Sequence, residues 1–341
     1  MSTTALILAA GKSTRMKSRR PKPMHEVCGR PMLEHVLRAC YSAGVEHVCI
    51  VVGHGKEEIL DYFSHDKRIS WVEQIEQLGT GHAARMCEPH LRKHHTPASR
   101  GGTGGGDVFV LAGDGPLIRD DVLRTLLQAH HDEHAAASMA TAVLDDPTGY
   151  GRIVRDAAGN FLEIVEQNDA TPEQRAIREV FPSYYCIKND DLLAALPQLT
   201  NQNAKHEYYL TDIYAHIRRS GRKVLAVQAV TQDDVLGVNT REQLAHVDAI
   251  MQARIQRQHR ENGVTIVSSD KTYIEAGAHI GQDTVLLPFT YIGRDASIGP
   301  DCAIGPFSLV PRSAVLTAGT TLANNTSSFN SAPFNPAGGS L

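Results

Sequence analysis

The sequence predicts an α/β domain built on a mostly parallel sheet, followed by a short parallel β-helix. Two observations lead to this prediction. From the first residues to about Val227, short apolar runs alternate with segments of helical periodicity, which is the rhythm of a doubly wound sheet. From Ile274 onward a branched aliphatic residue recurs every six residues instead, as in stacked β-helix coils. The 341 residues suffice for both regions, because a domain commonly takes about 150 residues.

The strand and helix signals of the first region follow one another closely. Strands are predicted over Ala5–Ala9, His47–Val52, Val108–Ala112 and Ala137–Val143, and helices near Pro31–Ala43 and Lys56–Phe63. These strand segments lack strict alternation of apolar and polar residues, which indicates strands covered by helices on both faces. The stretch from His94 to Asp107 is rich in glycine and lacks apolar anchors, so we expect a mobile surface loop there and no phosphate cradle.

The second region begins with a connecting helix over Thr240–Arg260, where Thr240 and Gln243 form a possible capping box. One helical stripe collects five apolar residues, Leu244, Val247, Ile250, Met251 and Ile255. The six-residue period then runs in one register from Ile274 to Leu322, and the residues beyond it carry neither charge nor periodicity. We therefore expect a first domain over 1–238, a connecting helix over 239–262, a β-helix over 263–323 and an irregular tail over 324–341.

Composition and charge argue against several classes of function. Lys and Arg total 34 against 38 Asp and Glu, a net charge of −4, so the chain has no general positive field for nucleic acid or an anionic membrane. Six scattered cysteines show no paired or metal-ligand spacing, which indicates free thiols. No basic region precedes the first apolar run, and nowhere do eighteen apolar residues follow one another. We therefore expect a cytoplasmic protein without a membrane segment.

The segment LILAAGKSTRM places a glycine turn directly after the first predicted strand. Backbone N–H groups at the carboxyl end of a parallel strand, with Arg15 nearby, suit nucleotide phosphates. The segment is not a P-loop, because Leu6 stands where that motif needs glycine, and it is not GxGxxG. On its own, an ordinary strand-to-helix turn explains the segment equally well.

Three histidines, His130, His131 and His134, fall on one predicted helix. An i, i+4 pair of histidines on a helix can bind zinc. Because no third ligand accompanies them in a recognised motif, a solvated helix face is the better interpretation.

A second segment, RPKPMHEVCGRPMLEHV, follows the first, and the two together resemble the sugar-1-phosphate nucleotidyltransferases. The resemblance is closest to the N-acetylglucosamine-1-phosphate uridylyltransferase half of the bacterial bifunctional uridylyltransferase/acetyltransferases. Further landmarks in the same order are EQIEQLGTGHA, LAGDGPLI, DDPTGYGRIV, IVEQNDAT, HEYYLTDI and LGVNTREQL. The family implies a Rossmann-like nucleotidyltransferase fold, and its hexapeptide pattern implies a left-handed β-helix of about three coils.

The resemblance also implies how the nucleotide is bound. Its nucleotide-binding positions match Leu8, Ala9, Gly11, Gln74, Gly79 and Thr80. An amide such as that of Gln74 can pair with a pyrimidine edge, and glycine lets the backbone approach the base closely. Lys22, which lies between two prolines, and Arg15 match the catalytic pair that neutralises phosphate charge. Without the surrounding motifs, the turn at Gly79 and Thr80 would be read as a plain helix start, and Lys22 as a solvated surface lysine.

Asp114 and Asn239 match the two protein ligands of a Mg²⁺ ion that bridges the phosphates in this family. Taken alone, Asp114 belongs to an ordinary GDGP turn and Asn239 to an ordinary helix N-cap. One carboxylate, one amide oxygen and the substrate oxygens form the hard-oxygen set that Mg²⁺ prefers. The resemblance therefore implies Mg²⁺ as the cofactor.

The family positions that hold the acetamido sugar and its phosphate match Gly151, Glu166, Tyr209 and Thr211. The following strand departs from the family pattern. An Asn-Ser/Thr-Gly triplet is usual there, and this chain has Phe181, Pro182 and Ser183 instead. An aromatic ring in place of an amide predicts a different contact with the 2-acetamido group, by ring stacking or apolar packing.

The resemblance implies an enzyme that transfers UMP from UTP to N-acetyl-α-glucosamine-1-phosphate and releases pyrophosphate, a step in cell wall precursor biosynthesis. The altered triplet leaves open a uridylyltransferase for another sugar-1-phosphate, and a catalytically silent nucleotide-binding scaffold is the alternative from a different class. The family's β-helix commonly forms a homotrimer, although three coils offer limited area. We expect no acetyltransferase activity, because VPRSA replaces the relatives' Arg-Pro-Gly at 310–314 and no His, Lys or Arg follows Leu322.

Overall fold

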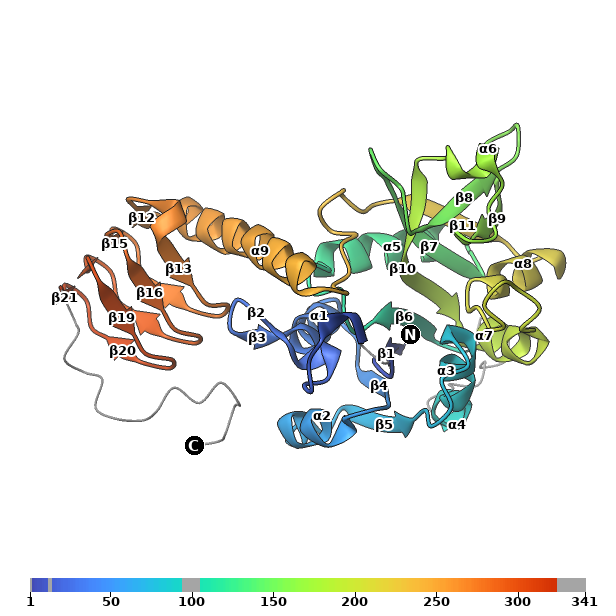
Figure 1. Cartoon of the computed structure of the whole chain (residues 1–341), viewed down its shortest axis with the longest axis horizontal. Helices are drawn as coiled ribbons and strands as arrows, with labels where there is room; N and C mark the ends of the chain where they lie inside the picture. Colours follow the sequence, from blue (N-terminus) through green and yellow to red (C-terminus); the bar gives the residue numbers. More distant parts are fainter. Residues whose placement is uncertain (1, 12–13, 94–104, 324–341) are drawn as a thin grey trace. The chain divides into compact units, whose positions relative to one another are not determined.

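The structure of the chain is a computed structural model that describes residues 2–11, 14–93 and 105–323. It divides into two compact units (Figure 1). The first unit comprises residues 1–25 and 31–244, and the second comprises residues 26–30 and 245–341. Most of the predicted surface loop, residues 94–104, and the predicted tail, residues 324–341, lie outside the described residues.

A nine-stranded sheet forms the centre of the first unit, in the order β11-β7-β10-β6-β1-β4-β5, with β8 and β9 attached at β10. The strands are β1 (Thr3–Leu8), β4 (His47–Val52), β5 (Ile69–Glu73), β6 (Asp107–Ala112), β7 (Ala137–Val143), β8 (Gly151–Arg155), β9 (Phe161–Val165), β10 (Glu179–Lys188) and β11 (Val224–Gln228). β1 pairs in parallel with β4 and β6, and β11 with β7, whereas β10 runs antiparallel to its neighbours β6 and β7. The predicted mostly parallel sheet is confirmed.

Helices cover both faces of this sheet. Successive strand residues point to opposite faces, and apolar side chains of β1 are buried on both. Ala5 and Ile7 of β1 belong to one buried cluster together with α1, α2 and α5, whereas Leu6 belongs to a second cluster with α3, α4, α7 and α8. The helices of this unit are α1 (Met32–Ser42), α2 (Lys56–Phe63), α3 (Thr80–Met86), α4 (Glu88–Lys93), α5 (Asp120–Asp132), α6 (Pro172–Arg175), α7 (Asn189–Ala195) and α8 (Asp212–Arg219). Short 3-10 turns occur at η1 (Thr14–Met16), η2 (Lys22–Met24) and η3 (Leu196–Gln198).

The strand order reverses at β1. From β1 the chain proceeds to β4 and β5 on one side and then crosses to β6 on the other side. In a parallel sheet such a reversal opens a crevice beyond the carboxyl ends of the two central strands, where ligands bind. The turns that follow Leu8 and Ala112 therefore mark the place where a site is expected.

The predicted solvated face of histidines on α5 is wrong for His130. This residue is fully buried, and its Nδ1 lies 2.8 Å from Ser138 Oγ. Nε2 of His130 lies 3.3 Å from Asp107 Oδ1, and Nε2 of His131 lies 2.6 Å from the other carboxylate oxygen. The pair holds a buried carboxylate at the amino end of β6, a partner that helical periodicity does not reveal. Within the described residues, no group of three or more His, Cys, Asp or Glu could hold a metal ion.

The second unit is mainly a stack of short strands, with η4 (Ser269–Lys271) among them. The strands are β12 (Thr265–Ile266), β13 (Thr272–Ile274), β14 (His279–Ile280), β15 (Val285–Leu286), β16 (Thr290–Ile292), β17 (Ser297–Ile298), β18 (Ala303–Ile304), β19 (Ser308–Val310), β20 (Val315–Leu316) and β21 (Thr321–Leu322). They form three parallel stacks, β12-β15-β18-β21, β13-β16-β19 and β14-β17-β20 (Figure 1). Ile274 pairs with Ile292 and Ile292 with Val310, and all three are fully buried. The six-residue period and the parallel β-helix are confirmed.

The backbone of these coils explains two features of the repeat. A positive φ recurs every six residues, at Gly277, Asp283, Phe289, Asp295, Asp301, Phe307, Ser313 and Gly319. A Cβ added at Gly293 would lie 2.5 Å from the backbone N of Arg312 in the next coil, and one at Gly281 would lie 2.4 Å from Pro300 N. The recurring Ile-Gly pairs therefore reflect how closely successive coils approach each other.

The helix α9 (Arg241–Glu261) buries amide side chains, whereas most residues of the predicted apolar stripe are not buried. Of the five stripe residues only Val247 is buried, whereas Gln252 and Gln256 are buried as well. Gln252 accepts from Ile274 N at 3.1 Å and donates to Ile274 O, and Gln256 donates to Thr272 O at 2.8 Å. Because β13 is the first strand of its stack, these amides satisfy an edge that no strand pairs with. Across the described residues, no helix is long and apolar enough to cross a membrane.

Candidate active site

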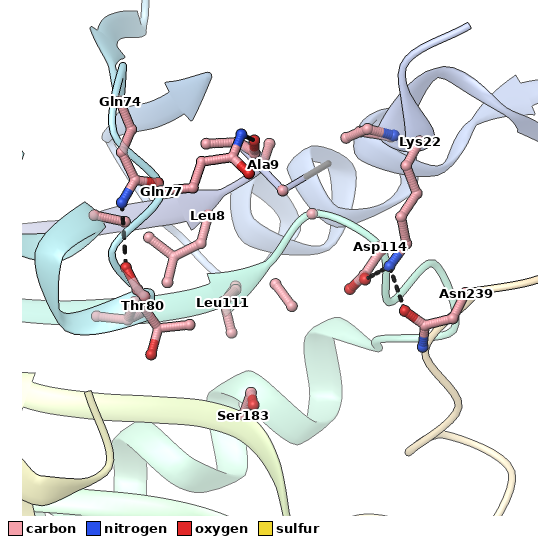
Figure 2. Close-up of a pocket in the computed structure, with 18 of the residues that line it drawn as sticks. Leu8, Ala9, Lys22, Gln74, Gln77, Thr80, Leu111, Asp114, Ser183 and Asn239 are labelled. Carbon is pink, nitrogen blue, oxygen red and sulfur yellow. Dashed lines mark hydrogen bonds and ion pairs between the residues drawn. The ribbon is translucent and has the colours of Figure 1, made fainter. Parts of the chain in front are cut away.

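A cavity of about 450 Å³ lies at the predicted crevice of the first unit (Figure 2). Ten of the fourteen predicted site residues line it: Leu8, Ala9, Gly11, Arg15, Lys22, Gln74, Gly79, Thr80, Asp114 and Asn239. Its wall also contains residues outside the fourteen predicted site residues, namely Ala10, Pro23, Gln77, Ala83, Val110, Leu111, Ala112, Gly113, Ser183, Tyr185 and Glu207. The cavity is therefore the candidate active site.

Side chains from distant parts of the chain meet at one end of this cavity. The Lys22 ammonium donates to Asp114 Oδ2 and also lies 2.7 Å from Asn239 Oδ1 (Figure 2). Arg15 donates to the same Asn239 oxygen at 3.0 Å. A carboxylate and an amide oxygen thus face one cationic group, and the Lys22 and Asp114 side chains are 13% and 28% exposed. These oxygens are of the kind that Mg²⁺ prefers, so the donor set fits the implied metal.

Backbone hydrogen bonds place Asp114 in the crevice. Gly113 N donates to Leu8 O at 3.0 Å, which ties the turn after β6 to the end of β1. Val238 N donates to Asp114 O at 3.0 Å, which brings the segment before α9 to the same turn. The carboxylate is therefore positioned by three segments that lie far apart in the sequence.

The first turn of α9 holds Asn239. Thr240 Oγ1 accepts from Gln243 N at 3.1 Å, as the predicted capping box requires. The Gln243 side chain, however, accepts from Asn239 N at 2.7 Å, one residue earlier than a standard box would have it. Gln243 thereby fixes the backbone of the residue whose side chain faces Lys22.

Arg241 connects this turn to the segments that carry Arg15 and Lys22. Its Nε donates to Met16 O at 3.2 Å, and its Nη1 lies 3.3 Å from His25 Nδ1. His25 N in turn donates to Lys22 O at 3.2 Å. Burial and the neighbouring Arg241 lower the pKa of His25 to about 4, so the imidazole is neutral and can accept. No motif pointed to this contact, because its partners are distant in sequence.

The other end of the cavity carries amides. Gln74 is 5% exposed, and its Nε2 donates to Gly79 O at 3.2 Å and lies 3.0 Å from His82 Nδ1. Gln77, which the sequence reading missed, donates to Ala10 O at 2.7 Å (Figure 2). Gln77 thus ties the loop after β5 to the glycine loop after β1. No local signal pointed to this bond, because Ala10 lies 67 positions away in the sequence.

The glycines of the GTG turn allow a close contact with a neighbouring segment of the chain. Gly79 has φ +102°, and an added Cβ would lie 2.7 Å from Tyr208 O. Gly81 N donates to the same oxygen at 2.7 Å, and its Cβ would lie 2.9 Å from it. Thr80 Oγ1 accepts from Leu210 N at 3.1 Å. The turn is glycine-rich because the segment before α8 packs directly on it.

The four residues assigned to the sugar form a separate group that does not line the cavity. Thr211 Oγ1 donates to Glu166 Oε1 at 3.2 Å, and a Cβ added at Gly151 would lie 3.7 Å from that oxygen. Burial raises the pKa of Glu166. Burial and nearby carboxylates raise the pKa of Tyr209 to about 12, and within the described residues its buried hydroxyl has no hydrogen-bond partner. Tyr185 lines the cavity, and burial together with the Glu166 carboxylate of this group raises its pKa.

The predicted stacking of Phe181 on the acetamido group is wrong. The ring is 4% exposed and packs edge to face on Tyr185 and Tyr214, at centroid distances of 4.7 and 5.9 Å. Pro182 is buried as well, and Ser183 is the residue of the altered triplet that lines the cavity. The strand turns the aromatic ring into the core because apolar burial stabilises it there.

The fold and this cavity define the chain as a nucleotidyltransferase. The family model described as MobA-like NTP transferase domain matches residues 5–211, and the chain belongs to this family. The model of bacterial transferase hexapeptide repeats matches residues 273–312. A solved structure of UDP-glucose pyrophosphorylase complexed with UDP-glucose shares the fold, with a TM-score of 0.61 over 74% of this chain and 100% of that chain, at 18% identity.

Curated relatives of the chain carry the name Bifunctional protein GlmU. That of Caldanaerobacter subterraneus subsp. tengcongensis is 43% identical over 286 residues, which cover 84% of this chain and 60% of that protein. That of Alkaliphilus oremlandii is 44% identical over 288 residues, with the same coverage of 84% and 60%. The chain thus spans about 60% of the length of these relatives.

Proposed function

We propose that the chain is a uridylyltransferase that converts UTP and N-acetyl-α-glucosamine-1-phosphate into UDP-N-acetylglucosamine and pyrophosphate. The observation that supports this most is the meeting of Arg15, Lys22, Asp114 and Asn239 at one end of a cavity at the switch point. Two cations beside two hard oxygen donors suit a polyphosphate, and the amides at the other end suit a base. The family resemblance of the motifs supplies the identity of the two substrates.

The reaction needs no protein base. An oxygen of the sugar phosphate, already anionic near pH 7, attacks the α-phosphorus of UTP. A new bond forms between that oxygen and the α-phosphorus, and the bond to the bridging oxygen of the leaving pyrophosphate breaks. No covalent enzyme intermediate is needed, so the chain's contribution is positioning and charge neutralisation.

Each residue of the cluster has a defined part. Lys22 and Arg15 neutralise the charge that grows on the α-phosphate and on pyrophosphate. Pro21 and Pro23 restrict the backbone on both sides of Lys22, and Asp114 and Asn239 hold its ammonium by hydrogen bonds. Asp114 and Asn239 would hold Mg²⁺, which would supply a further positive charge to the site.

Pyrophosphate release is the measurement that tests this function. UTP and Mg²⁺ are held constant while N-acetylglucosamine-1-phosphate, glucose-1-phosphate and galactosamine-1-phosphate are offered in turn. Selective release with the acetamido glucose phosphate supports the proposal. Equal or faster turnover of another sugar phosphate would assign the chain to that sugar. UTP binding without pyrophosphate release from any substrate would favour the scaffold.

The homotrimer and the absence of acetyl transfer stay predictions. Phe289, Phe307 and Val315 of the β-helix are 51%, 57% and 75% exposed, which supports an apolar contact with further copies of the chain. Sedimentation equilibrium measures the oligomeric state. Acetyl-coenzyme A dependent thiol release, with glucosamine-1-phosphate as acceptor, measures acetyl transfer.

A further inference from the structure

Ser183 has an unusual backbone for a strand residue. It lies in β10, where the register against β7 shifts between Val180, which pairs with Ala142, and Tyr184, which pairs with Ala140. Three residues of β10 therefore stand opposite one residue of β7, an irregularity larger than the common two-against-one β-bulge. Ser183 takes a φ of +67° there, a conformation that residues with a Cβ rarely adopt. Such strain persists where the surrounding structure imposes it, often beside a functional site.

The three residues of this irregularity, Phe181, Pro182 and Ser183, lie in different environments. Phe181 and Pro182 are buried, whereas Ser183 is partly exposed and lines the cavity (Figure 2). Within the described residues, its hydroxyl has no hydrogen bond to another residue. The hydroxyl therefore can both donate to and accept from a molecule that enters the cavity.

The position of Ser183 along the wall points to the sugar end of that molecule. Phe181, two residues earlier on β10, pairs with Gly151, where an added Cβ would lie 3.7 Å from Glu166 Oε1. Tyr185, two residues later, also lines the cavity and lies within electrostatic range of Glu166. Both of these neighbours of Ser183 on β10 are associated with Glu166, so Ser183 lines the cavity on a stretch of β10 that is near the group of Glu166 and Thr211.

We propose that Ser183 is a specificity-determining residue whose Oγ hydrogen-bonds to the 2-acetamido group of the sugar phosphate. The inference rests on the proposed function and adds the residue that selects among sugars. A hydroxyl can donate to the acetamido carbonyl or accept from the acetamido N–H, and a sugar with a plain 2-hydroxyl has neither of these groups. With Phe181 in the core, Ser183 is the polar side chain that the altered triplet presents to the cavity.

Two substitutions at this position separate the hydroxyl from the backbone. Ser183→Ala removes the hydroxyl and keeps a Cβ at positive φ, whereas Ser183→Gly removes both the hydroxyl and the strain. We measure kcat/KM for N-acetylglucosamine-1-phosphate and glucose-1-phosphate with saturating UTP. Both variants should lower the ratio of the two values by about three- to tenfold, the effect of one neutral hydrogen bond. The melting temperature of Ser183→Gly should exceed that of Ser183→Ala.

Ser313→Gly is the matched control, because Ser313 also has a positive φ, +58°, and lies in a corner of the β-helix. It should leave the sugar ratio unchanged. An unchanged ratio in both Ser183 variants would overturn the proposal, as would a rise in KM for UTP alone. If the wild-type chain turns over neither sugar, the proposed function fails. In that case, calorimetry compares the binding of UDP-N-acetylglucosamine with that of UDP-glucose in the wild type and in both Ser183 variants. Loss of the wild-type preference for UDP-N-acetylglucosamine in both variants supports the role of Ser183. An unaltered preference refutes it.

Discussion

Ser183 and Ser313 have nearly the same backbone φ, +67° and +58°, in regions of the molecule built on different principles. Ser313 belongs to a series of left-handed residues that recurs every six positions along the β-helix. Ser183 is an isolated case, created by a register shift between two strands of the central sheet. The first conformation follows from a local repeat, whereas the second is imposed by neighbours that are distant in the sequence.

The same contrast holds for what the residues do. In the β-helix, equivalent positions such as Ile274 and Ile292 stack on each other and contribute burial. In the crevice, Lys22, Asp114 and Asn239 come from three segments and contribute charge and oxygen donors. We therefore expect changes in the β-helix to lower stability without altering chemistry, and changes in the crevice to do the reverse. The following substitutions test that separation.

Asp114→Ala should have the largest effect, a loss of turnover of roughly 1,000-fold or more, because it removes the charged oxygen donor of the site. The melting temperature should change little, since Asp114 lies in a partly exposed turn. Asp301→Ala, at an exposed corner of the β-helix with φ +57°, is the matched control and should keep turnover. Near-normal Mg²⁺-dependent pyrophosphate release by Asp114→Ala would contradict the metal assignment.

Ile292→Ala should destabilise the second unit by about 2–5 kcal/mol, because it leaves a cavity between stacked coils. Ile292 is fully buried, whereas Val267, the control site for a Val→Ala change in the same unit, is 55% exposed. Chemical unfolding followed by circular dichroism measures the difference between the two variants. kcat per folded molecule should stay as in the wild type, and a loss of kcat in Ile292→Ala would break the proposed separation of stability and chemistry.

Lys22→Ala should lower kcat by about 100-fold, with a smaller change in KM for the sugar phosphate, because the ammonium acts on charge that develops in the transition state. Lys67→Ala, on an exposed surface position, is the control. Steady-state kinetics at varied sugar phosphate separates the two constants. A rise in KM with kcat unaltered would assign Lys22 to ground-state binding.

Asp107 predicts a pH dependence of stability that is independent of the active site. Burial acts to raise its pKa, but hydrogen bonds with His130 and His131 outweigh this and lower the pKa to about 2. Since the unfolded value is 3.8, the carboxylate contributes stability that is fully present above pH 3.8 and is lost as the pH falls toward 2. The expected contribution is on the order of 2 kcal/mol. In Asp107→Asn, the free energy of unfolding should fall less steeply as the pH decreases from 3.8 toward 2. The same pH dependence as in the wild type would contradict this account.

The sequence by itself determined the classes of structure. Apolar runs without alternation predicted the covered strands of the first unit, and the six-residue period predicted which aliphatics are buried in the second. Both signals are local, because each depends on spacing along one segment and on the tendency of apolar side chains to leave water. Motif resemblance then placed ten of the fourteen predicted site residues on one cavity wall.

Only the tertiary structure decided how those residues act on each other. Several contacts had no local signal in the sequence. They are the place of Ser183 on the cavity wall, the ring of Phe181 in the core, the hydrogen bonds from Gln77 to Ala10 and from Arg241 to Met16, and the close approach of Tyr208 to Gly79. Each depends on two segments that are far apart in sequence and meet only when the sheet has formed. A hydrogen bond or a steric contact acts over about 3 Å, so its partners are defined by the folded arrangement and not by spacing along the chain.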